Sequence, residues 1–315
     1  MSDRPDTRPS PVTLPDLSDR RVVLTGGSDG MGVHIAHLLA GAGADLVLPV
    51  RNRGKGESTA TAIRAAHPDA RVSVVDLDLS SLDSVRGCAD ALVSDGRAVH
   101  HLVNNAGVMT PPSQQRTADG FELQLGTNHL GHVALTSHLL PLLRAGGGRV
   151  TWQTSIAARR GRMPWDDVNS ERSYDAMAAY RASKLACALY GFELDRRSRA
   201  AGWGITSNVS HPGVAPTSLL AARPELGRSN DTVGVRVIRW LSARGILAGT
   251  AESAGQPALL AATDPDGGGR FYGPSGPGGL GGAPGRQRLW APLRDEAAAA
   301  RLWDLSHELI GVTVP

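Results

Sequence analysis

A glycine turn near the start of the chain constrains the fold most. The apolar run 21–25 stops at Gly26-Gly27-Ser28-Asp29-Gly30-Met31-Gly32 and continues into the helical pattern of residues 34–39. Glycines at such a point let the backbone turn tightly and approach a ligand, while a helix N-terminus presents unpaired N–H groups to a phosphate. The spacing is T-G-x-x-x-G-x-G, and its strand, turn and helix context predicts a dinucleotide-binding site.

Predicted strands and helices alternate along the rest of the chain. Apolar runs that fit strands lie at residues 21–25, 45–50, 71–75, 101–103, 149–154 and 204–209, with helical patterns between them. Regular alternation of this kind is typical of a parallel sheet with helices on both faces. The predicted fold is therefore α/β, with a single Rossmann-type doubly wound parallel sheet and a small C-terminal lid or extension.

The remaining segments complete the predicted domain organisation. Residues 1–17 are rich in proline and indicate a disordered tail, whereas residues 18–315 form one dinucleotide-binding catalytic domain. Irregular sequence at 156–179 indicates a substrate loop, and 216–249 is predicted to be a lid segment. Within that segment, residues 231–244 form an amphipathic helix that either closes over a pocket or packs on the sheet edge. Further helices are predicted near 120–143, 180–199, 252–263 and 294–310, around a Gly/Pro-rich stretch at 266–285.

Charge and hydropathy exclude several kinds of partner. The chain of 315 residues has a formal charge of +3, and its arginines are spread out rather than gathered into a run, so no nucleic-acid partner is expected. No apolar run approaches the roughly 18 residues of a membrane helix. The N-terminus is polar and lacks the apolar region of a signal peptide. We therefore expect a cytoplasmic protein without a membrane partner.

The cysteines and histidines do not form a metal-binding pattern. Cys88 and Cys187 lie far apart in apolar surroundings, which indicates buried thiols in a reducing compartment. The histidine pairs 34/37 and 129/132 lack a carboxylate or cysteine at ligand spacing. We expect helix-surface or core roles for these histidines and no metal site.

The end of the second predicted strand indicates the cofactor. In a dinucleotide-binding fold this strand end faces the adenosine ribose, where a carboxylate selects the 2′-hydroxyl and an arginine the 2′-phosphate. Val50 and Arg51 occupy this place, and Asn52 follows them. A guanidinium can pair bidentately with phosphate, so the sequence favours NADP(H). Asp29 precedes Gly30, and its negative charge would oppose a 2′-phosphate, which keeps NAD(H) open as an alternative.

The other strand ends carry polar groups. An aspartate in Asp76-Leu77-Asp78-Leu79 can accept from an adenine amino group or cap the next helix. The following strands end in Asn104-Asn105-Ala106-Gly107 and in Ser155. Pocket chemistry in open parallel sheets gathers at such carboxyl ends.

Tyr180 and Lys184 lie one helical turn apart and share a face. An ammonium at about 4 Å and an effective dielectric near 20 is worth roughly 4 kcal/mol, so we expect it to lower the pKa of the phenol toward neutrality. By itself this spacing arises by chance in many helices. It gains meaning from the glycine turn and the polar strand ends.

Taken together, Thr25-Gly26…Gly30-Met31-Gly32, Asn104-Asn105-Ala106-Gly107, Ser155 and Tyr180…Lys184 resemble the short-chain dehydrogenase/reductase family. More narrowly, Asp76-Leu77-Asp78-Leu79-Ser80, the stretch 127–132, His211-Pro212-Gly213-Val214 and the stretch 302–306 resemble the bacterial retinol dehydrogenase and protochlorophyllide reductase branch. The resemblance covers nearly everything from residue 18 to residue 312.

The resemblance implies a role for each matching residue. Tyr180 exchanges a proton with the substrate oxygen, Lys184 lowers the pKa of Tyr180 and holds the nicotinamide ribose, Ser155 hydrogen-bonds the carbonyl, and Asn128 anchors a water in the proton relay. Tyr174 is excluded as the reacting tyrosine because Ala178 lies four residues on. The implied cofactor-binding residues are Gly26, Ser28, Gly30, Met31, Gly32, Arg51, Asn52, Asp78, Leu79, Asn105, Ala106, Gly107, Tyr180, Lys184, Pro212, Gly213, Val214 and Thr217.

The expected function is an NADPH-dependent carbonyl reductase acting on a ketone or aldehyde. The alternatives are an NAD-dependent alcohol dehydrogenase working in the oxidative direction and a dinucleotide-binding sensor without turnover. The expected partner is a small carbonyl or alcohol compound, and a homodimer or homotetramer is left open. Met109, Met163, Trp165 and Trp240 suggest a bulky apolar substrate.

Overall fold

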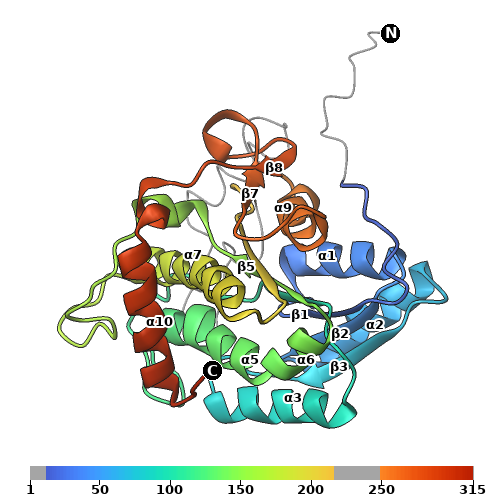
Figure 1. The fold of residues 1–315 in the computed structure, drawn as a ribbon, viewed down its shortest axis with the longest axis horizontal. Coiled ribbons are helices and arrows are strands. Elements are labelled where there is room, and N and C mark those ends of the chain that lie inside the picture. Colours follow the sequence, from blue (N-terminus) through green and yellow to red (C-terminus); the bar gives the residue numbers. More distant parts are fainter. Residues whose placement is uncertain (1–11, 216–248, 315) are drawn as a thin grey trace.

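The computed structural model describes residues 12–215 and 249–314, and the strands of these residues form one sheet (Figure 1). The strand order is β3-β2-β1-β4-β5-β6-β7-β8, in which every neighbouring pair is parallel except β7 and β8. The predicted doubly wound sheet is confirmed. The strands are β1 (Arg21–Leu24), β2 (Asp45–Val50), β3 (Val72–Asp76), β4 (His101–Asn104), β5 (Arg149–Gln153), β6 (Thr206–Ser210), β7 (Phe271–Pro274) and β8 (Pro284–Arg286).

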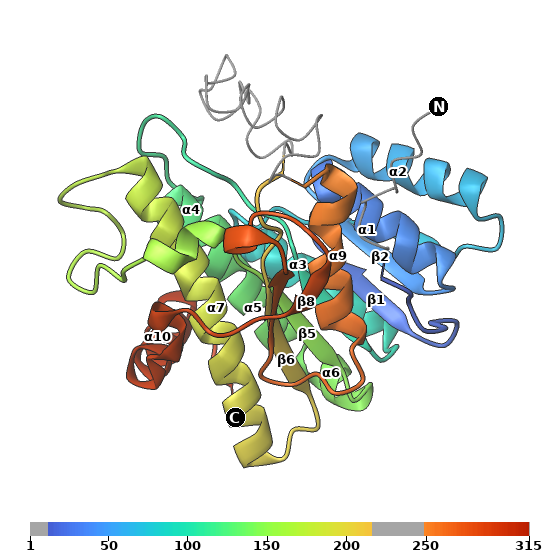
Figure 2. The ribbon, with the colours of Figure 1, turned by 90° about the horizontal axis from the view of Figure 1, so that it is seen from above.

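Helices cover both faces of the sheet (Figures 1 and 2). On one face lie α1 (Gly30–Gly41), α2 (Arg53–Ala66) and α9 (Ala251–Thr263). On the other lie α3 (Leu82–Asp95), α5 (Gly131–His138), α6 (Leu140–Ala145) and α7 (Ala176–Ala201), with α10 (Glu296–Ile310) packed on α7. Alternate residues of β1 serve the two cores, since Val23 packs into one and Val22 and Leu24 into the other. This two-sided burial explains why the central strands are continuous apolar runs.

The predicted helix at 120–143 is broken into four pieces. It consists of α4 (Leu123–Leu125), a π-helical turn η1 (Gly126–Leu130), α5 and α6. Pro141 lies in the first turn of α6, where a residue without an N–H is tolerated. The wider π turn contains Asn128, and such turns often mark functional sites.

The C-terminal part of the sheet extends further than predicted. The Gly/Pro-rich stretch 266–285 contains β7, where Phe271 and Tyr272 are fully buried and Phe271 pairs with Val209 of β6. Only two large apolar residues mark this strand, so its pattern was too short to recognise. Short helical turns complete the fold at η2 (Ile156–Arg160), η4 (Pro277–Gly279) and η5 (Ala291–Arg294).

Residues 12–17, which the sequence places in the predicted disordered tail, are described in the structure and contact the domain. Leu17 is buried in the core beneath α1, and its N–H donates to the carbonyl of Ala42 at 2.8 Å. The N–H of Val12 donates to Oε1 of Gln256 at 2.6 Å. Residues 12–17 therefore pack against the domain, because apolar Leu14 and Leu17 lie between the prolines of the predicted tail. Nearly all of the predicted lid, 216–249, lies outside the described residues.

Two of the smaller expectations can be checked directly. Both cysteines are free and buried. Among residues 12–215 and 249–314, no helix combines the length and apolar character that crossing a membrane requires.

Candidate active site

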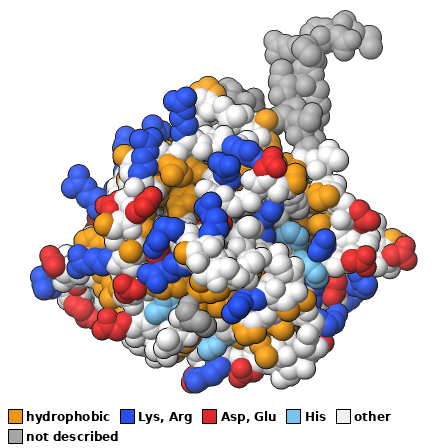
Figure 3. Space-filling view, viewed as in Figure 1, with side chains coloured by type: hydrophobic (Ala, Val, Ile, Leu, Met, Phe, Trp, Pro, Cys, Tyr) orange, Lys and Arg blue, Asp and Glu red, His pale blue; other side chains and the backbone are white. Residues whose placement is uncertain are grey.

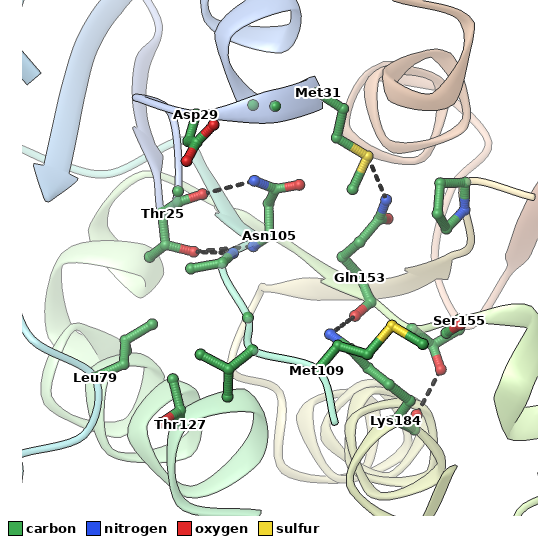
Figure 4. A pocket seen from close by; sticks show the side chains of 18 of the residues that line it. Thr25, Asp29, Met31, Leu79, Asn105, Met109, Thr127, Gln153, Ser155 and Lys184 are labelled. Carbon is green, nitrogen blue, oxygen red and sulfur yellow. Dashed lines mark hydrogen bonds between the residues drawn. The ribbon is translucent and has the colours of Figure 1, made fainter. Parts of the chain in front are cut away.

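The carboxyl ends of the central strands open into a cavity of about 390 Å³ (Figure 4). Its walls come from the β1–α1 turn, the ends of β2, β4 and β5, one face of α7 and the segment after β6. Every predicted site residue lines this cavity except two. Asn128 lies behind its wall, and Thr217 falls outside the described residues.

The glycine turn after β1 is shaped for a close ligand. Gly26 and Gly30 have φ values of +68° and +54°, which side chains disfavour. A Cβ on Gly32 would lie 1.9 Å from the carbonyl oxygen of Gly26. The N-terminal end of α1 therefore reaches the cavity with its backbone exposed, as phosphate binding at a helix N-terminus requires.

Thr25 and Asn105 tie this turn to the end of β4, as Figure 4 shows. The main-chain N–H groups of Asn105 and Ala106 donate to Oγ1 of Thr25 at 2.9 and 3.0 Å, and Nδ2 of Asn105 donates to the carbonyl of Thr25 at 2.9 Å. Oδ1 of Asn105 and Oγ1 of Thr127 are buried and have no partner within the described structure. Buried polar atoms are normally paired, so these two atoms fit a polar ligand in the cavity.

Basic side chains mark the far end of the cavity, beyond β2. Arg51 and Asn52 are exposed and line it, and Asn52 also caps α2 by accepting from the N–H of Lys55 at 2.9 Å. Lys55 lines the cavity as well, and its Nζ lies 3.6 Å from Oδ2 of Asp29. The carboxylate next to the glycine turn therefore has a cationic neighbour, while Arg51 has no ion pair within the described residues.

Asp78, which follows β3, accepts hydrogen bonds from the protein. Oδ1 of Asp78 accepts from the N–H of Ser80 at 2.9 Å and from its hydroxyl at 2.6 Å. Asp78 thus orders the turn that leads into α3, whose own cap is Ser81. Asp78 and Leu79 still line the cavity.

Ser155, Tyr180 and Lys184 meet at the opposite end of the cavity. Ser155 follows β5 and caps η2, its hydroxyl oxygen accepting from the N–H of Ala157 at 3.2 Å. Tyr180 and Lys184 project from α7, which begins four residues before Tyr180 because Asp175 caps it. Both side chains are buried, and Nζ of Lys184 donates to the carbonyl of Gln153 at 3.1 Å. These three residues bring two hydroxyls and an amine into one apolar recess.

Burial controls the protonation of this group. It raises the pKa of Tyr180 to about 12, although a hydrogen bond with Ser155 works in the opposite direction. Desolvation also lowers the pKa of Lys184. The pKa of Tyr180 is therefore not lowered toward neutrality in this structure, because desolvation raises it by more than the hydrogen bond with Ser155 lowers it.

The side chain of Asn128 lies behind the cavity wall and stabilises it by hydrogen bonds. Its side chain accepts from the N–H of Val108 at 2.7 Å and donates to the Val108 carbonyl and to Oγ of Ser183, each at 3.0 Å. A Cβ on Gly107 would lie 2.9 Å from Oδ1 of Asn128 and 3.2 Å from Nζ of Lys184. Only a glycine fits between these groups.

His132 joins the main chain of Asn128 to the glycine turn. Its Nδ1 lies 2.9 Å from the carbonyl oxygen of Asn128, and its Nε2 lies 2.9 Å from Oγ1 of Thr25. Burial lowers the pKa of His132 to about 3, so the ring is neutral. Its Nδ1–H then donates to Asn128, and its Nε2 accepts from the Thr25 hydroxyl. Both His129 and His132 are buried core residues, which confirms their expected role.

The apolar end of the cavity differs from the expected substrate region. Met109, Ile156 and Met177 line it, whereas Met163 and Trp165 pack against the main core, and Arg301 lies over the Trp165 ring at 4.4 Å. Met163 and Trp165 therefore do not line the described cavity, as the prediction of a bulky apolar substrate supposed, because both side chains pack against the main core. Trp240 lies outside the described residues. Tyr174, already excluded from the sequence, donates its hydroxyl to the carbonyl of Pro111 at 3.0 Å.

Several lining residues were not predicted as site residues from the sequence, among them Gln153, Lys55 and Met177. The carbonyl oxygen of Gln153 accepts a hydrogen bond from Nζ of Lys184, and the side chain of Gln153 lies 3.7 Å from Sδ of Met31. Lys55 could have been found from its position four residues after Arg51, at the start of a helix. Met177 could have been found as the residue one turn before Tyr180.

The family model for short chain dehydrogenases matches residues 20–226, more than half of the chain. With the sheet and cavity described above, this shows that the chain belongs to the short-chain dehydrogenase family. It is an NAD(P)-dependent oxidoreductase of the type that acts on CH–OH and C=O groups.

Known relatives place the chain in the retinol dehydrogenase-like branch. Retinol dehydrogenase 13 of Homo sapiens is 37% identical over 98% of this chain and 88% of its own. A solved structure of an uncharacterised protein from Mycobacterium paratuberculosis is 33% identical, covers 97% of this chain and 100% of its own, and has a TM-score of 0.77. A solved structure from Beutenbergia cavernae, described as a putative NAD(P)-dependent gluconate 5-dehydrogenase with NADP bound at low occupancy, is 26% identical, covers 79% of this chain and 91% of its own, and has a TM-score of 0.58.

Proposed function

We propose that this protein is an NADPH-dependent carbonyl reductase that converts a ketone or aldehyde to an alcohol. The observation that carries the proposal is the buried Tyr180 hydroxyl, which lines the cavity beside Ser155 and Lys184. With a pKa of about 12 it is protonated at neutral pH. A phenol in this state can give a proton to a developing alkoxide.

The cavity supports the proposed cofactor along its whole length. The glycine turn and the N-terminus of α1 would hold the pyrophosphate, and Asn105, Lys184 and the segment Pro212 to Val214 would hold the nicotinamide half. At the ribose end, the described lining residues include two cations, Arg51 and Lys55, and one carboxylate, Asp29, which lies 3.6 Å from Nζ of Lys55, so the charge of these three residues is positive. An excess of cationic groups favours the 2′-phosphate of NADP over the neutral 2′-hydroxyl of NAD.

The residues of the chain account for the oxygen half of the reaction. When bound, the reduced nicotinamide supplies the hydride that forms the new C–H bond. The π-electron pair of the carbonyl moves to its oxygen, which the hydroxyls of Ser155 and Tyr180 stabilise as hydrogen-bond donors. The O–H bond of Tyr180 breaks and its proton passes to that oxygen, giving the alcohol. The ammonium of Lys184, beside Gln153, is placed to stabilise the tyrosinate that remains.

Tyr180 is in the protonation state from which reduction would start, whereas the alternative, NAD-dependent alcohol oxidation, would start from the phenolate. Oxidation needs the phenolate as a base, and forming it from a phenol with a pKa of about 12 is unfavourable at neutral pH. The apolar lining by Met109, Ile156 and Met177 suits a substrate with an apolar body. We propose a bulky apolar carbonyl compound on this basis.

The decisive experiment compares a substitution of Tyr180 with the same substitution of the nearby Tyr174. A panel of ketones and aldehydes is screened by NADPH oxidation, and Tyr180→Phe and Tyr174→Phe are assayed on the best substrate. We expect Tyr180→Phe to lower kcat by at least about a hundredfold while NADPH binding stays near that of the parent protein. Tyr174→Phe, which removes a hydroxyl bound to Pro111, should keep most of the activity. Full activity of Tyr180→Phe would refute the proposal, and binding without turnover of any compound would favour the sensor.

The cofactor assignment is tested separately by reversing the charge of Arg51. Arg51→Asp should raise the KM for NADPH by at least about tenfold and leave the KM for NADH unchanged or lower, because a carboxylate repels phosphate and accepts from a ribose hydroxyl. Arg53→Asp is the matched control, since Arg53 is paired with Asp76 at 3.0 Å and does not line the cavity. An unchanged KM for NADPH in Arg51→Asp would show that the phosphate is not bound there.

A further inference from the structure

A second cavity, of about 380 Å³, adjoins the active site. Ile156, Ala157 and Met177 line both cavities, so a molecule that reaches Ser155 and Tyr180 from this side passes along them. The remaining lining residues are Arg159, Arg160, Arg181, Gly278 and Leu280. The second cavity therefore has a basic wall at the substrate end of the active site.

Within the described part of the chain, no acidic side chain balances the charge of this wall. Of the eight described residues that line it, three are arginines and none is acidic. Arg159 and Arg160 are exposed and Arg181 is half-buried, and within residues 12–215 and 249–314 none of their side chains makes a hydrogen bond or ion pair. Most other arginines near the surface have such a partner, as Arg116 has Glu171 and Arg197 has Glu193. Three guanidinium groups around one hollow are suited to an anion.

The same two elements that carry the catalytic hydroxyls also carry these arginines. Arg159 and Arg160 end the short helix η2, which begins directly after Ser155. Arg181 follows Tyr180 on α7, one turn after Met177. A Cβ on Gly161 would lie 2.8 Å from the carbonyl oxygen of Arg181, so the end of η2 packs closely on α7. The backbone that carries the arginines is therefore packed close to the backbone that carries the reacting groups.

We propose that the second cavity is a subsite for an anionic group of the substrate, in the simplest case a carboxylate. The substrate would be a carbonyl compound whose apolar chain runs past Met177 and Leu280 and whose charged end meets Arg159, Arg160 and Arg181. This inference rests on the proposed reductase function and narrows its substrate class. The hollow shape and the shared lining favour a small molecule over a flat anionic surface.

Matched acid and ester substrates test the subsite. Straight-chain oxo acids of increasing length, each with a methyl ketone at the far end, are compared with their methyl esters by NADPH oxidation. For the parent protein we expect a higher kcat/KM for the best acid than for its ester. In the double variant Arg159→Gln/Arg181→Gln the acid-to-ester ratio should fall by about 5- to 25-fold, since each exposed charge pair is worth up to about a factor of five. Arg144→Gln, an exposed arginine that lines neither cavity, should leave the ratio unchanged.

A binding measurement separates failure of the subsite from failure of the reductase function. Titration calorimetry with octanoate, an anion without a carbonyl to reduce, needs no turnover. If neither acids nor esters are reduced, the reductase proposal fails, and weaker octanoate binding by the double variant still supports the subsite. If acids and esters are reduced equally well, or the double variant keeps the ratio of the parent protein, the subsite is refuted. If no compound is turned over, equal octanoate binding by the double variant and the parent protein refutes the subsite.

Discussion

Three buried histidines make the stability of the fold depend on pH. His129, His132 and His211 have side chains that are at most 1% exposed. Desolvation lowers the pKa to about 3 for His129 and His132 and to about 4 for His211. In the unfolded chain each histidine titrates near 6.5. The folded state therefore keeps three neutral rings at a pH where the unfolded chain charges them.

The sign and size of the effect follow from this difference. A group whose folded pKa is lowered stabilises fully above the unfolded pKa, and this stability is lost as the pH falls from 6.5 toward the folded pKa. At pH 5 each histidine lowers the free energy of unfolding by about 2 kcal/mol, so three lower it by about 6 kcal/mol. A typical domain has only about 5–15 kcal/mol. Asp264, with a pKa of about 2, adds to acid lability only at lower pH, which leaves the range from 6.5 to 5 to the histidines.

Urea unfolding followed by tryptophan fluorescence between pH 8 and 5 measures this loss. The variant His129→Phe keeps the ring volume, and Ser306 keeps its bond to the carbonyl of Leu302 at 2.7 Å. We expect the free energy of unfolding of this variant to fall less steeply between pH 6 and 5 than that of the parent protein. The two slopes should differ by about 1.4 kcal/mol per pH unit. His34→Gln, at an exposed position, should keep the slope of the parent protein. A free energy that is constant from pH 8 to 5, or an unchanged slope in His129→Phe, would refute the reasoning.

Two further predictions concern packing. Gly32→Ala should weaken NADPH binding by at least about tenfold in a fluorescence titration, because its Cβ would lie 1.9 Å from the Gly26 carbonyl; Gly87→Ala, whose Cβ meets nothing within 4 Å, should bind as the parent does. Trp303→Ala should lower the free energy of unfolding in urea by about 3–5 kcal/mol, because the indole is buried and stacks on Tyr190 with ring centroids 4.6 Å apart. A loss below about 1 kcal/mol would show that the stack adds little.

The sequence predicted the parts of the fold that local pattern controls. The strands from β1 to β6 are apolar runs between glycine or polar turns. A Cβ at position 26 or 32 would meet backbone atoms, and Gly30 has a positive φ, so glycine is favoured at all three positions. The polar residues at the strand ends, such as Asn105 and Ser155, were found because parallel strands end at one edge of the sheet. These signals require no knowledge of distant contacts.

What the sequence could not reveal depends on contacts between distant residues. Strand β7 exists because Phe271 pairs beside Val209, although 62 residues separate them in the chain. His132 looks like a core histidine in sequence, and only the fold shows that it connects Thr25 with Asn128. The arginines at 159, 160 and 181 lie in an irregular segment and on a helix, so no periodicity marks their common cavity.

Tyr180 and Lys184 show most clearly where local reasoning ends. Helical spacing places phenol and amine on one face, and Coulomb attraction alone predicts that each favours the charged form of the other. Both side chains are buried, however, and desolvation favours the neutral form of each. The lysine meets this cost by donating to the carbonyl of Gln153 rather than by ionising its neighbour. Tyr180 is therefore protonated at neutral pH, and this is the state that the proposed carbonyl reduction requires.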